Sequence, residues 1–554
     1  MQPSTLAKRV WLLLFIAVSV SYFYGLGYFP FVGPDEPRYA EVAREMFLRH
    51  DLITPTLGGH PWFEKPALLY WMMIGSFGVF GVSEWAARLG PAISGLLTAG
   101  AVYWIGCRID MARKDEAKTS DDDPGAPGRG TSAALVAVST GGLIVFSRGA
   151  SFDILLTMSV TFALVLYLAS QIGKQTRNRH WLLAGFYCFV GVSLLAKGLV
   201  GIVIPFGVIA AYFCLSRRLP DRETMVSLVW GLPLALIVGA VWYGPVIARN
   251  GWPFIDQFFI QHHFARYLSN KYHHPQPIYF YLPVILLICL PWTPFLVETL
   301  VKARRWRWRA EDAESKSLVF FLAWFVFPLV FFSLSGSKLP GYVLPSAPAA
   351  ALLAGDRLTA FMRRASGNTL AMRCTGLVLL LASLAGVIFG ARFENLSLRC
   401  SLLVVGPLLV SGVVAIGWAK RRQLSVALIV LSVPAAVTLS LHCAAARFTE
   451  RENVRELVKA ADAQGYGSAP LFMFEKVERT AEFYAAGRLA YAADGEPVRF
   501  ELVSQVVNQA RQTSGPILIF LRPRSVPALA STKEIQTTVL GTNGATTLVA
   551  VQMR

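Results

Sequence analysis

Residues 8–41 read KRVWLLLFIAVSVSYFYGLGYFPFVGPDEPRYAE. Two cations, a long apolar run and an acidic, proline-containing segment follow one another in this stretch. An apolar run of roughly 20 residues can cross a bilayer as a helix, and Lys or Arg before it is typical of the cytoplasmic side. No small-residue cleavage site precedes residues 22–31. We therefore predict a retained signal anchor, helical over residues 11–31, that delivers residues 33–84 to the outer face.

The whole composition supports a membrane protein. The chain has 554 residues, of which 54% are hydrophobic and 16% charged, with a mean hydropathy of +0.49. Apolar runs continue from Trp11 to Leu441 with charged breaks between them. The net charge of +18 could suggest nucleic acid, but the Lys and Arg residues stand in short loops between the runs. We interpret them as topology signals and expect no nucleic-acid partner.

The apolar run at residues 67–82 decides the side of every later loop. If it crossed fully, the Arg-rich loops would lie outside, against the positive-inside rule. We therefore predict that it lies in or re-enters the interface, that residues 85–106 span, and that residues 108–129 form a flexible cytoplasmic linker. About thirteen spans and an outer C-terminus follow. The cations placed inside are Lys174, Arg177, Arg179, Arg217, Arg218, Arg222, residues 302–309, Arg363, Arg364 and residues 420–422.

The tail after Leu441 has a soluble pattern. Residues 471–474 and 517–521 are expected to be strands, and residues 452–463 and 503–511 helices. We predict an all-α transmembrane domain over residues 1–445, with interfacial helices in loop 33–84, followed by a soluble α/β domain over residues 446–554. The seven cysteines lie in or beside apolar runs without C-x-x-C spacing, which argues against a disulfide framework and a structural zinc site.

The segment after Asp35 is predicted to be an amphipathic helix. Tyr39, Val42, Ala43, Met46 and Phe47 have the spacing of one helical face, and Arg38, Glu41, Arg44 and Glu45 fall on the opposite face. Such a helix can lie on a membrane with its polar face turned away. Pro37 suits the first turn, and Asp35 suits a helix cap, so capping competes with a functional role for this carboxylate.

Several motifs together resemble a known family. They are Asp35 to Glu41 (DEPRYAE), Phe63 to Pro66 (FEKP), Phe258 to Tyr267 (FFIQHHFARY), and Phe332-Ser333 with Lys338 to Pro345 (KLPGYVLP). In this combination the chain resembles the lipid A aminoarabinose transferases, which belong to the protein-mannosyltransferase-like group with the GT-C glycosyltransferase fold. The resemblance covers essentially the whole chain. The acidic motif is shared with the wider group, whereas E-K-P with K-L-P-x-Y is more specific.

The resemblance implies transfer of 4-amino-4-deoxy-L-arabinose from undecaprenyl phosphate to a lipid A phosphate on the periplasmic face of the inner membrane. Such a product would carry less negative charge, which would give resistance to polymyxin and other cationic antimicrobial peptides. It implies Asp35 as the catalytic carboxylate and Asp153 as a second one. The residues implied at the carrier phosphate are Lys65, Arg266, Lys338 and Tyr342, and those implied in the substrate cavity are Glu36, Arg38, Tyr39, Glu64 and His263.

The predicted topology is an independent check on this set, because Asp35, Lys65, Asp153, His263, Arg266 and Lys338 all fall at the outer side. Fixed cations suit a lipid phosphate. Each also has a plainer interpretation. The lysines could reach toward lipid headgroups, and Arg266 could contact them. Asp153 could pair locally with Arg148, and Lys197 is expected to be an anchor or a secondary phosphate contact.

No metal is expected to be required. His262 and His263, like His273 and His274, are adjacent pairs whose members point to different helix faces, so a site would use one of each pair. Glu64 with His263 is the pair that a divalent ion such as zinc would use. The expected partners are the donor, the lipid A acceptor and membrane lipids, with the chain as a monomer.

Two rival functions remain. A transporter or lipid flippase would also have many spans, but ionisable groups near the midplane and symmetric halves would be expected, whereas here the charges gather on one side and no repeat is visible. Transfer of another sugar, or protein O-mannosylation, would fit the same acidic motif and is the alternative within the enzymes.

Overall fold

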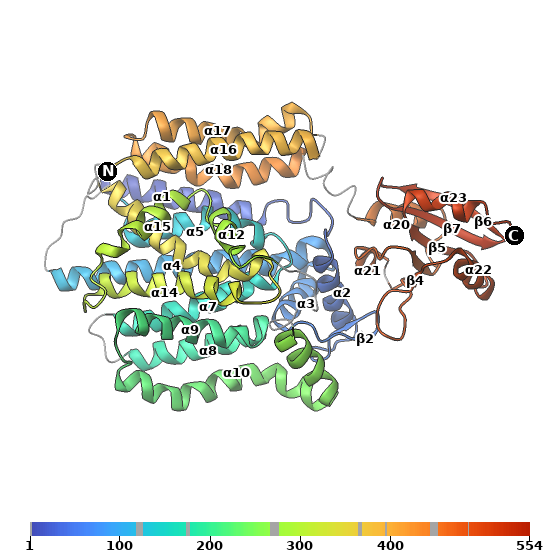
Figure 1. The fold of residues 1–554 in the computed structure, drawn as a ribbon, viewed down its shortest axis with the longest axis horizontal. Coiled ribbons are helices and arrows are strands. Elements are labelled where there is room, and N and C mark those ends of the chain that lie inside the picture. The colour runs from blue at the N-terminus through green and yellow to red at the C-terminus, as the bar shows by residue number, and fades with distance from the viewer. Residues whose placement is uncertain are drawn as a thin grey trace. The chain divides into compact units, whose positions relative to one another are not determined.

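The computed structural model describes residues 3–117, 126–172, 178–265, 276–363, 368–393, 396–443, 453–485 and 487–554. They form two compact units (Figure 1). The first contains residues 1–24, 64–69 and 88–440, and the second contains residues 25–63, 70–87 and 441–554. The second unit thus combines the first loop of the chain with its C-terminal segment. The predicted domain boundary at residue 445 stays a prediction.

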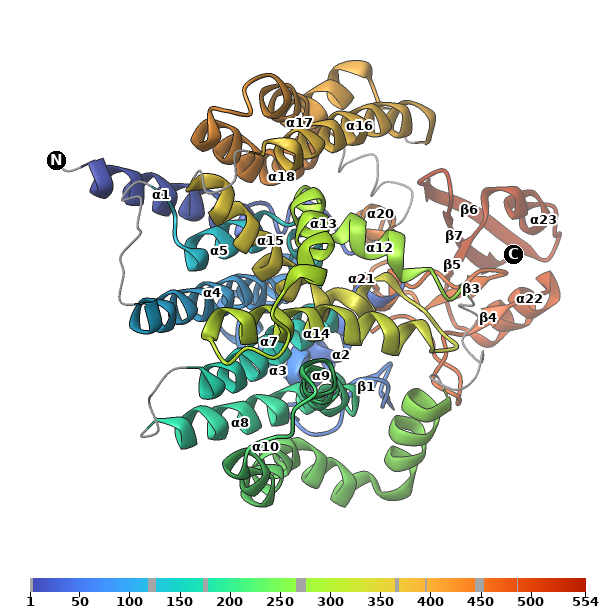
Figure 2. The same ribbon diagram turned by 60° about the vertical axis from the view of Figure 1, so that its left-hand side comes forward.

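The first unit is helical. Its elements are α1 (Pro3–Phe23), α4 (Glu84–Ala117), α5 (Arg129–Ser139), α6 (Gly141–Ser147), α7 (Phe152–Gln171), α8 (Arg179–Lys197), α9 (Val200–Ser216), α10 (Arg222–Ile255), η1 (Asp256–Ala265), α12 (Tyr281–Ile288), α13 (Thr293–Lys302), η2 (Ala303–Arg305), α14 (Ala313–Ser333), η3 (Pro340–Ser346), α15 (Ala347–Met362), α16 (Leu370–Phe393), α17 (Leu398–Gly417) and α18 (Arg422–Cys443). Neighbouring helices pack as pairs, among them α7 with α8, α14 with α9, and α16 with α17 (Figure 2).

Within the described residues, eight helices are long and apolar enough to cross a membrane. The number rises to ten if two bent pairs count as one span each: α5 with α6, bent by 58°, and α12 with α13, bent by 118°. The chain is therefore a polytopic membrane protein, as its composition predicts. Shorter apolar helices are found at Arg9–Phe23 within α1 and at Val200–Ser216 (α9), and the expectation of about thirteen spans stays a prediction.

Two predicted helix boundaries are wrong. Helix α1 ends at Phe23 and not at residue 31, because Gly25 takes a φ of +67° and Pro30 follows shortly after it. Helix α4 continues through Ala117, so residues 108–117 are helical and not part of a linker. This stretch, RIDMARKDEA, consists largely of good helix formers.

The second unit begins with the first loop. It contains α2 (Asp35–Leu48), the two-stranded hairpin of β1 (Thr56–Leu57) and β2 (His60–Pro61), and most of α3 (Leu68–Phe80). Helix α3 has 13 residues. At about 1.5 Å per residue it is too short to cross some 30 Å of hydrocarbon. This length agrees with the prediction that residues 67–82 do not form a full span.

The C-terminal segment forms a five-stranded sheet in the order β4-β3-β5-β7-β6 (Figure 1). Strand β3 is parallel to β4 and β5, whereas β7 is antiparallel to β5 and β6. The predicted strands at 471–474 and 517–521 and the predicted helix at 503–511 are confirmed. The elements are α20 (Arg455–Ala463), β3 (Leu471–Phe474), α21 (Ala481–Tyr484), β4 (Arg499–Phe500), α22 (Val503–Gln512), β5 (Ile517–Leu521), η4 (Pro523–Ser525), α23 (Val526–Ala530), β6 (Ile535–Thr542) and β7 (Thr547–Met553).

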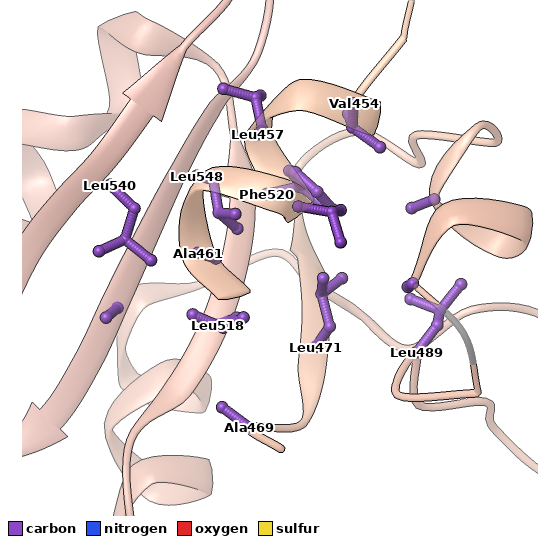
Figure 3. Packing of buried hydrophobic residues seen from close by; sticks show 14 of the residues in the cluster. Val454, Leu457, Ala461, Ala469, Leu471, Leu489, Leu518, Phe520, Leu540 and Leu548 are labelled. Atoms are coloured by element: carbon purple, nitrogen blue, oxygen red, sulfur yellow. The ribbon is translucent and has the colours of Figure 1, made fainter. Parts of the chain in front are cut away.

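Both faces of this sheet are covered by apolar side chains. On one face, Leu457 and Ala461 of α20 pack with Leu518, Leu540 and Leu548 (Figure 3). On the other face, α22 packs through apolar side chains against the same central strands. Strands β3 and β5 are buried along their whole length, which explains their continuous apolar sequence. Each fully buried Leu contributes about 1.5–3 kcal/mol to folding.

The cysteines depart from the sequence prediction at one place. Cys400 and Cys443 are disulfide-bonded, whereas the other five cysteines are free. Cys400 lies near the start of α17 and Cys443 at the end of α18. Their spacing in the sequence gives no sign of a disulfide.

Candidate functional site

The candidate residues fall into two groups, one in each unit, and each group is described by itself. In the first unit, Asp153 lies in the first turn of α7, where the Ser151 hydroxyl caps the helix by accepting from the Asp153 backbone N–H at 3.1 Å. The Asp153 carboxylate accepts a hydrogen bond from the Lys197 ammonium in an ion pair. Their side chains are only 21% and 16% exposed. The pair joins the N-terminal end of α7 to the C-terminal end of α8, where helix dipoles favour an anion and a cation respectively.

The KLPGYVLP segment brings a third element to this pair. It forms η3, and the Lys197 Nζ lies 4.5 Å from the centre of the Tyr342 ring, within reach of a cation–π interaction. Gly341 permits the close approach, because a Cβ atom at this position would lie 2.2 Å from Asp153 Oδ2. The Tyr281 hydroxyl donates to the Leu339 carbonyl at 3.2 Å and fixes the start of the segment.

Lys338 is the first residue of this segment and lies just before η3. Its side chain is buried, with the residue 7% exposed, and Nζ donates to the Ser335 carbonyl oxygen at 2.7 Å. An ammonium has three donors, and the described residues supply one acceptor for it. Lys338 therefore keeps donor capacity for an anion, and it stands a few residues before Gly341 and Tyr342, which approach the Asp153–Lys197 pair.

In the second unit, Asp35 is the first residue of α2 and its side chain is 56% exposed. Arg38 donates to Asp35 Oδ1 at 2.8 Å and to the Pro34 carbonyl at 2.9 Å. The Arg38 guanidinium and the Tyr39 ring both approach Trp62, at 5.8 Å and 6.1 Å between group centres. Glu36 is buried and accepts from the Val32 N–H at 3.4 Å.

Glu64 and Lys65 lie in the segment before α3 and are half-buried. Arg266 and the side chain of His263 lie outside the described residues, as do His273 and His274. Among the residues that are described, no group of three or more His, Cys, Asp or Glu side chains could hold a metal ion. The predicted Glu64–His263 pair stays a prediction.

The structure decides two alternatives left open by the sequence. Asp35 does not cap α2, because the helix has no side-chain cap hydrogen bond. Asp153 pairs with Lys197 and not with Arg148, which donates to the backbone carbonyls of Ser21 and Tyr24.

The sequence did not predict the ion pair between Lys197 and Asp153, because the two residues lie 44 positions apart in the chain. The available signal is a lysine inside the apolar run LLAKGLV, since such a charge usually faces a partner within the protein.

The polar face of α2 also differs from the prediction. Glu41 is 4% exposed and Arg44 has a side-chain exposure of 15%, because both lie against α21. Glu45 accepts from Thr56 at 2.5 Å and from the Gly58 N–H at 2.6 Å in the hairpin. The helix is therefore covered by protein on the face that was expected to be free.

Comparison with known proteins gives three likenesses. Residues 8–114 match the family described as dolichyl-phosphate-mannose-protein mannosyltransferase. Over 376 residues the chain is 32% identical to the undecaprenyl phosphate-alpha-4-amino-4-deoxy-L-arabinose arabinosyl transferase of Pseudomonas aeruginosa strain UCBPP-PA14, covering 67% of this chain and 63% of that protein. The protein of the same name from Erwinia tasmaniensis is 34% identical, over 58% of this chain and 54% of its own length. The chain thus spans less than two thirds of these relatives.

The fold likeness covers nearly the whole chain. The crystal structure of ArnT from Cupriavidus metallidurans bound to undecaprenyl phosphate superposes with a TM-score of 0.78 at 24% identity, over 98% of both chains. The apo structure of that protein gives a TM-score of 0.77 at 23% identity. The predicted fold class is thereby confirmed: the chain has the fold of the ArnT structures and is similar in sequence, over two thirds of its length, to aminoarabinosyl transferases.

Proposed function

We propose that the chain is an integral-membrane glycosyltransferase that moves 4-amino-4-deoxy-L-arabinose from undecaprenyl phosphate to a phosphate of lipid A. The observation that carries this proposal is the 32% identity over 376 residues to a protein named for that donor. The ArnT structure bound to undecaprenyl phosphate supports the same carrier. The match to the mannosyltransferase family over residues 8–114 keeps a protein acceptor as the second candidate.

The site residues suit this chemistry. The acceptor oxygen attacks the anomeric carbon, the bond from that carbon to the carrier phosphate oxygen breaks, and the electron pair leaves with the phosphate. Fixed cations stabilise the charge that grows on this leaving group. Lys338 has N–H donors available for the leaving phosphate. Lys197 forms an ion pair with Asp153, and a bound phosphate would compete with Asp153 for the ammonium. Lys65, Arg266 and Tyr342 complete the proposed phosphate-binding set.

Asp35 would serve mainly as an orienting group. A lipid A phosphate is largely ionised near neutral pH, so its oxygen attacks without a strong general base. The Arg38–Asp35 pair is partly exposed and lies within one helix turn. Such a pair is worth only about 0.3–0.5 kcal/mol, so Asp35 or Arg38 can exchange its partner for a substrate group at little cost.

We further propose that the reaction occurs on the periplasmic side and requires no metal. Disulfides persist in oxidising compartments, and the disulfide-bonded Cys443 lies at the start of the C-terminal segment, which begins at Leu441. The disulfide supports a periplasmic tail, which is also what the odd number of spans expected from the sequence predicts. Transfer that survives treatment with a chelator would support the absence of a metal, and its loss and recovery with zinc would support a site at Glu64 and His263.

The proposed function is tested by mass spectrometry of lipid A from a transferase-null Gram-negative strain that makes the donor and expresses this chain. We expect the aminoarabinose addition with the wild type and with Asp462→Asn, a surface carboxylate of the C-terminal domain. The addition should be lost with Asp153→Asn and with Asp35→Asn at equal protein levels. Unmodified lipid A with the wild type would overturn the acceptor or sugar assignment, and glycosylated periplasmic proteins would then support the second candidate.

A further inference from the structure

The short helix α21 of the C-terminal domain contacts the first loop on both sides of Asp35. On the N-terminal side, the Phe31 backbone N–H donates to the Tyr484 hydroxyl at 2.7 Å, and the Phe31 and Phe483 rings lie edge to face with centres 4.8 Å apart. On the C-terminal side, Arg44 donates to the Phe483 carbonyl at 3.0 Å, and its guanidinium lies 4.9 Å from the centre of the Phe483 ring. Two adjacent residues therefore hold the segment before Asp35 and the helix after it.

The Tyr484 contact is anchored further. The hydroxyl that accepts from Phe31 donates to Glu84 Oε1 at 2.9 Å, and the same oxygen accepts from Arg455 Nη1 at 3.1 Å. The Glu84 side chain is 16% exposed. A chain of hydrogen bonds thus runs from the first loop through Tyr484 to the first residue of α4 and back to α20. Charge-assisted bonds of this kind are about twice as strong as neutral ones.

The Arg44 contact is anchored on its own helix. Arg44 pairs with Glu41 at 2.5 Å, one turn earlier on α2. Because α2 is a continuous helix from Asp35 to Leu48, its first turn moves with the turn that carries Arg44. The hairpin beside α2 is covered as well, since a Cβ atom added to Gly58 would lie 2.4 Å from the Tyr491 ring.

We propose that Phe483 and Tyr484 position Asp35, so that the C-terminal domain is part of the catalytic apparatus and not an independent binding module. Phe483 and Tyr484 are positioning residues, because they act through Phe31 and α2 and touch no reacting group. The catalytic half of this inference rests on the proposed function. The structural half, that α21 holds residues 31–48 in place, does not.

The test uses the full-length protein in detergent or nanodiscs. Tyr484→Phe removes one hydroxyl and keeps the ring, and Arg44→Ala removes the second contact. Tyr466→Phe is the matched control, since Tyr466 packs on the same domain and no contact of its hydroxyl with the first loop is found among the described residues. Amide hydrogen exchange of residues 31–48 is measured with the rate of sugar transfer, separated into kcat and the donor KM.

We expect exchange in residues 31–48 to accelerate at least about fivefold in both variants, the amount that corresponds to losing one hydrogen bond worth about 1 kcal/mol. We expect kcat to fall about tenfold or more with a donor KM within about twofold, because orientation is lost and donor binding is not. Tyr466→Phe should match the wild type in each measurement.

Different results would contradict the positioning role of α21 and the proposed function. Unchanged exchange in residues 31–48, or faster exchange with unchanged kcat, overturns the positioning role. A wild-type protein that does not use this donor overturns the proposed function instead, and the exchange data alone then decide whether α21 holds the segment.

Discussion

At the scale of single residues, the Asp153–Lys197 pair is the most informative contact in the first unit. A carboxylate or an ammonium alone at membrane depth is costly, and such groups usually have a partner within the protein. Here each has one, and the Tyr342 ring covers the cation. Leaving one member of a largely buried pair without the other is strongly destabilising. The pair therefore joins the start of α7 to the end of α8 and holds both side chains in place.

Gly341 gives a sharp test of this arrangement. In Gly341→Ala the new Cβ would lie 2.2 Å from Asp153 Oδ2 and 2.8 Å from Phe146 Cε1, so η3 or Asp153 must move. Overpacking of this kind costs about 1–3 kcal/mol, and about 1.4 kcal/mol corresponds to tenfold in rate. We expect the transfer rate to fall about tenfold or more at equal protein level.

Gly244→Ala is the control, because a Cβ at this helical position has open space around it. It should transfer sugar at the wild-type rate. A Gly341→Ala protein with the full rate would show that the approach of η3 to Asp153 is not needed for transfer.

At the scale of elements, α2 shows how an amphipathic pattern can mislead. Its apolar face is buried, as predicted, but its charged face also lies against protein. The result is a carboxylate in an unfavourable place. Burial raises the pKa of Glu41 from its ordinary value of 4.5 to about 7, even though Arg44 opposes the shift. Glu45 and Glu482 add to the rise, and Tyr491 lies near the same charges.

This shift predicts a pH dependence of stability. The folded state holds the proton of Glu41 more tightly than the unfolded state, so the contribution is full below about pH 4.5 and is lost as pH rises through about 7. We expect wild-type stability to fall over this window relative to Glu41→Gln, by up to about 3 kcal/mol. Thermal unfolding of the detergent-solubilised protein at pH 5 and pH 8 measures the difference.

Glu501→Gln serves as the comparison, because the Glu501 side chain is 56% exposed and pairs with Arg499 on the surface. Its pH dependence should equal that of the wild type. If Glu41→Gln also follows the wild-type curve, the Glu41 carboxyl does not carry the effect.

At the scale of the whole molecule, the disulfide bears on the orientation of the chain. Cys400 lies near the start of α17 and Cys443 at the end of α18, and both are disulfide-bonded. If these helix ends face the periplasm, the bond forms by exchange with a protein disulfide of that compartment, which is reduced to a dithiol as the two thiols are oxidised.

We expect Cys400 and Cys443 to react with a maleimide only after denaturation and reduction, and to stay reduced in cells that lack periplasmic thiol oxidation. A gel-shift alkylation assay measures both, with the other five cysteines replaced by serine. Cys374 reinstated in this background is the control, since it is a free thiol and should be alkylated without reduction. Reduced Cys400 and Cys443 in normal cells would argue for the opposite orientation.

The sequence by itself determined that this is a membrane protein, because the length of an apolar run can be read locally and the bilayer thickness sets the length that a spanning helix needs. It also predicted strands β3 and β5, whose continuous apolar residues can only be buried. By resemblance it named the candidate site residues, whose roles stay predictions. It did not predict β6 and β7, whose pairing depends on neighbours distant in the chain.

Only the tertiary structure decided which charges meet. The pairing of Asp153 with Lys197 joins two helices, and the covering of Glu41 and Arg44 requires α21 from the far end of the sequence. Cys400 and Cys443 are likewise disulfide-bonded, although they lie in different helices. These contacts have one physical reason in common. A charged or polar side chain has the same local pattern whether it faces solvent, lipid headgroups or a partner, and its partner is fixed only when the helices pack.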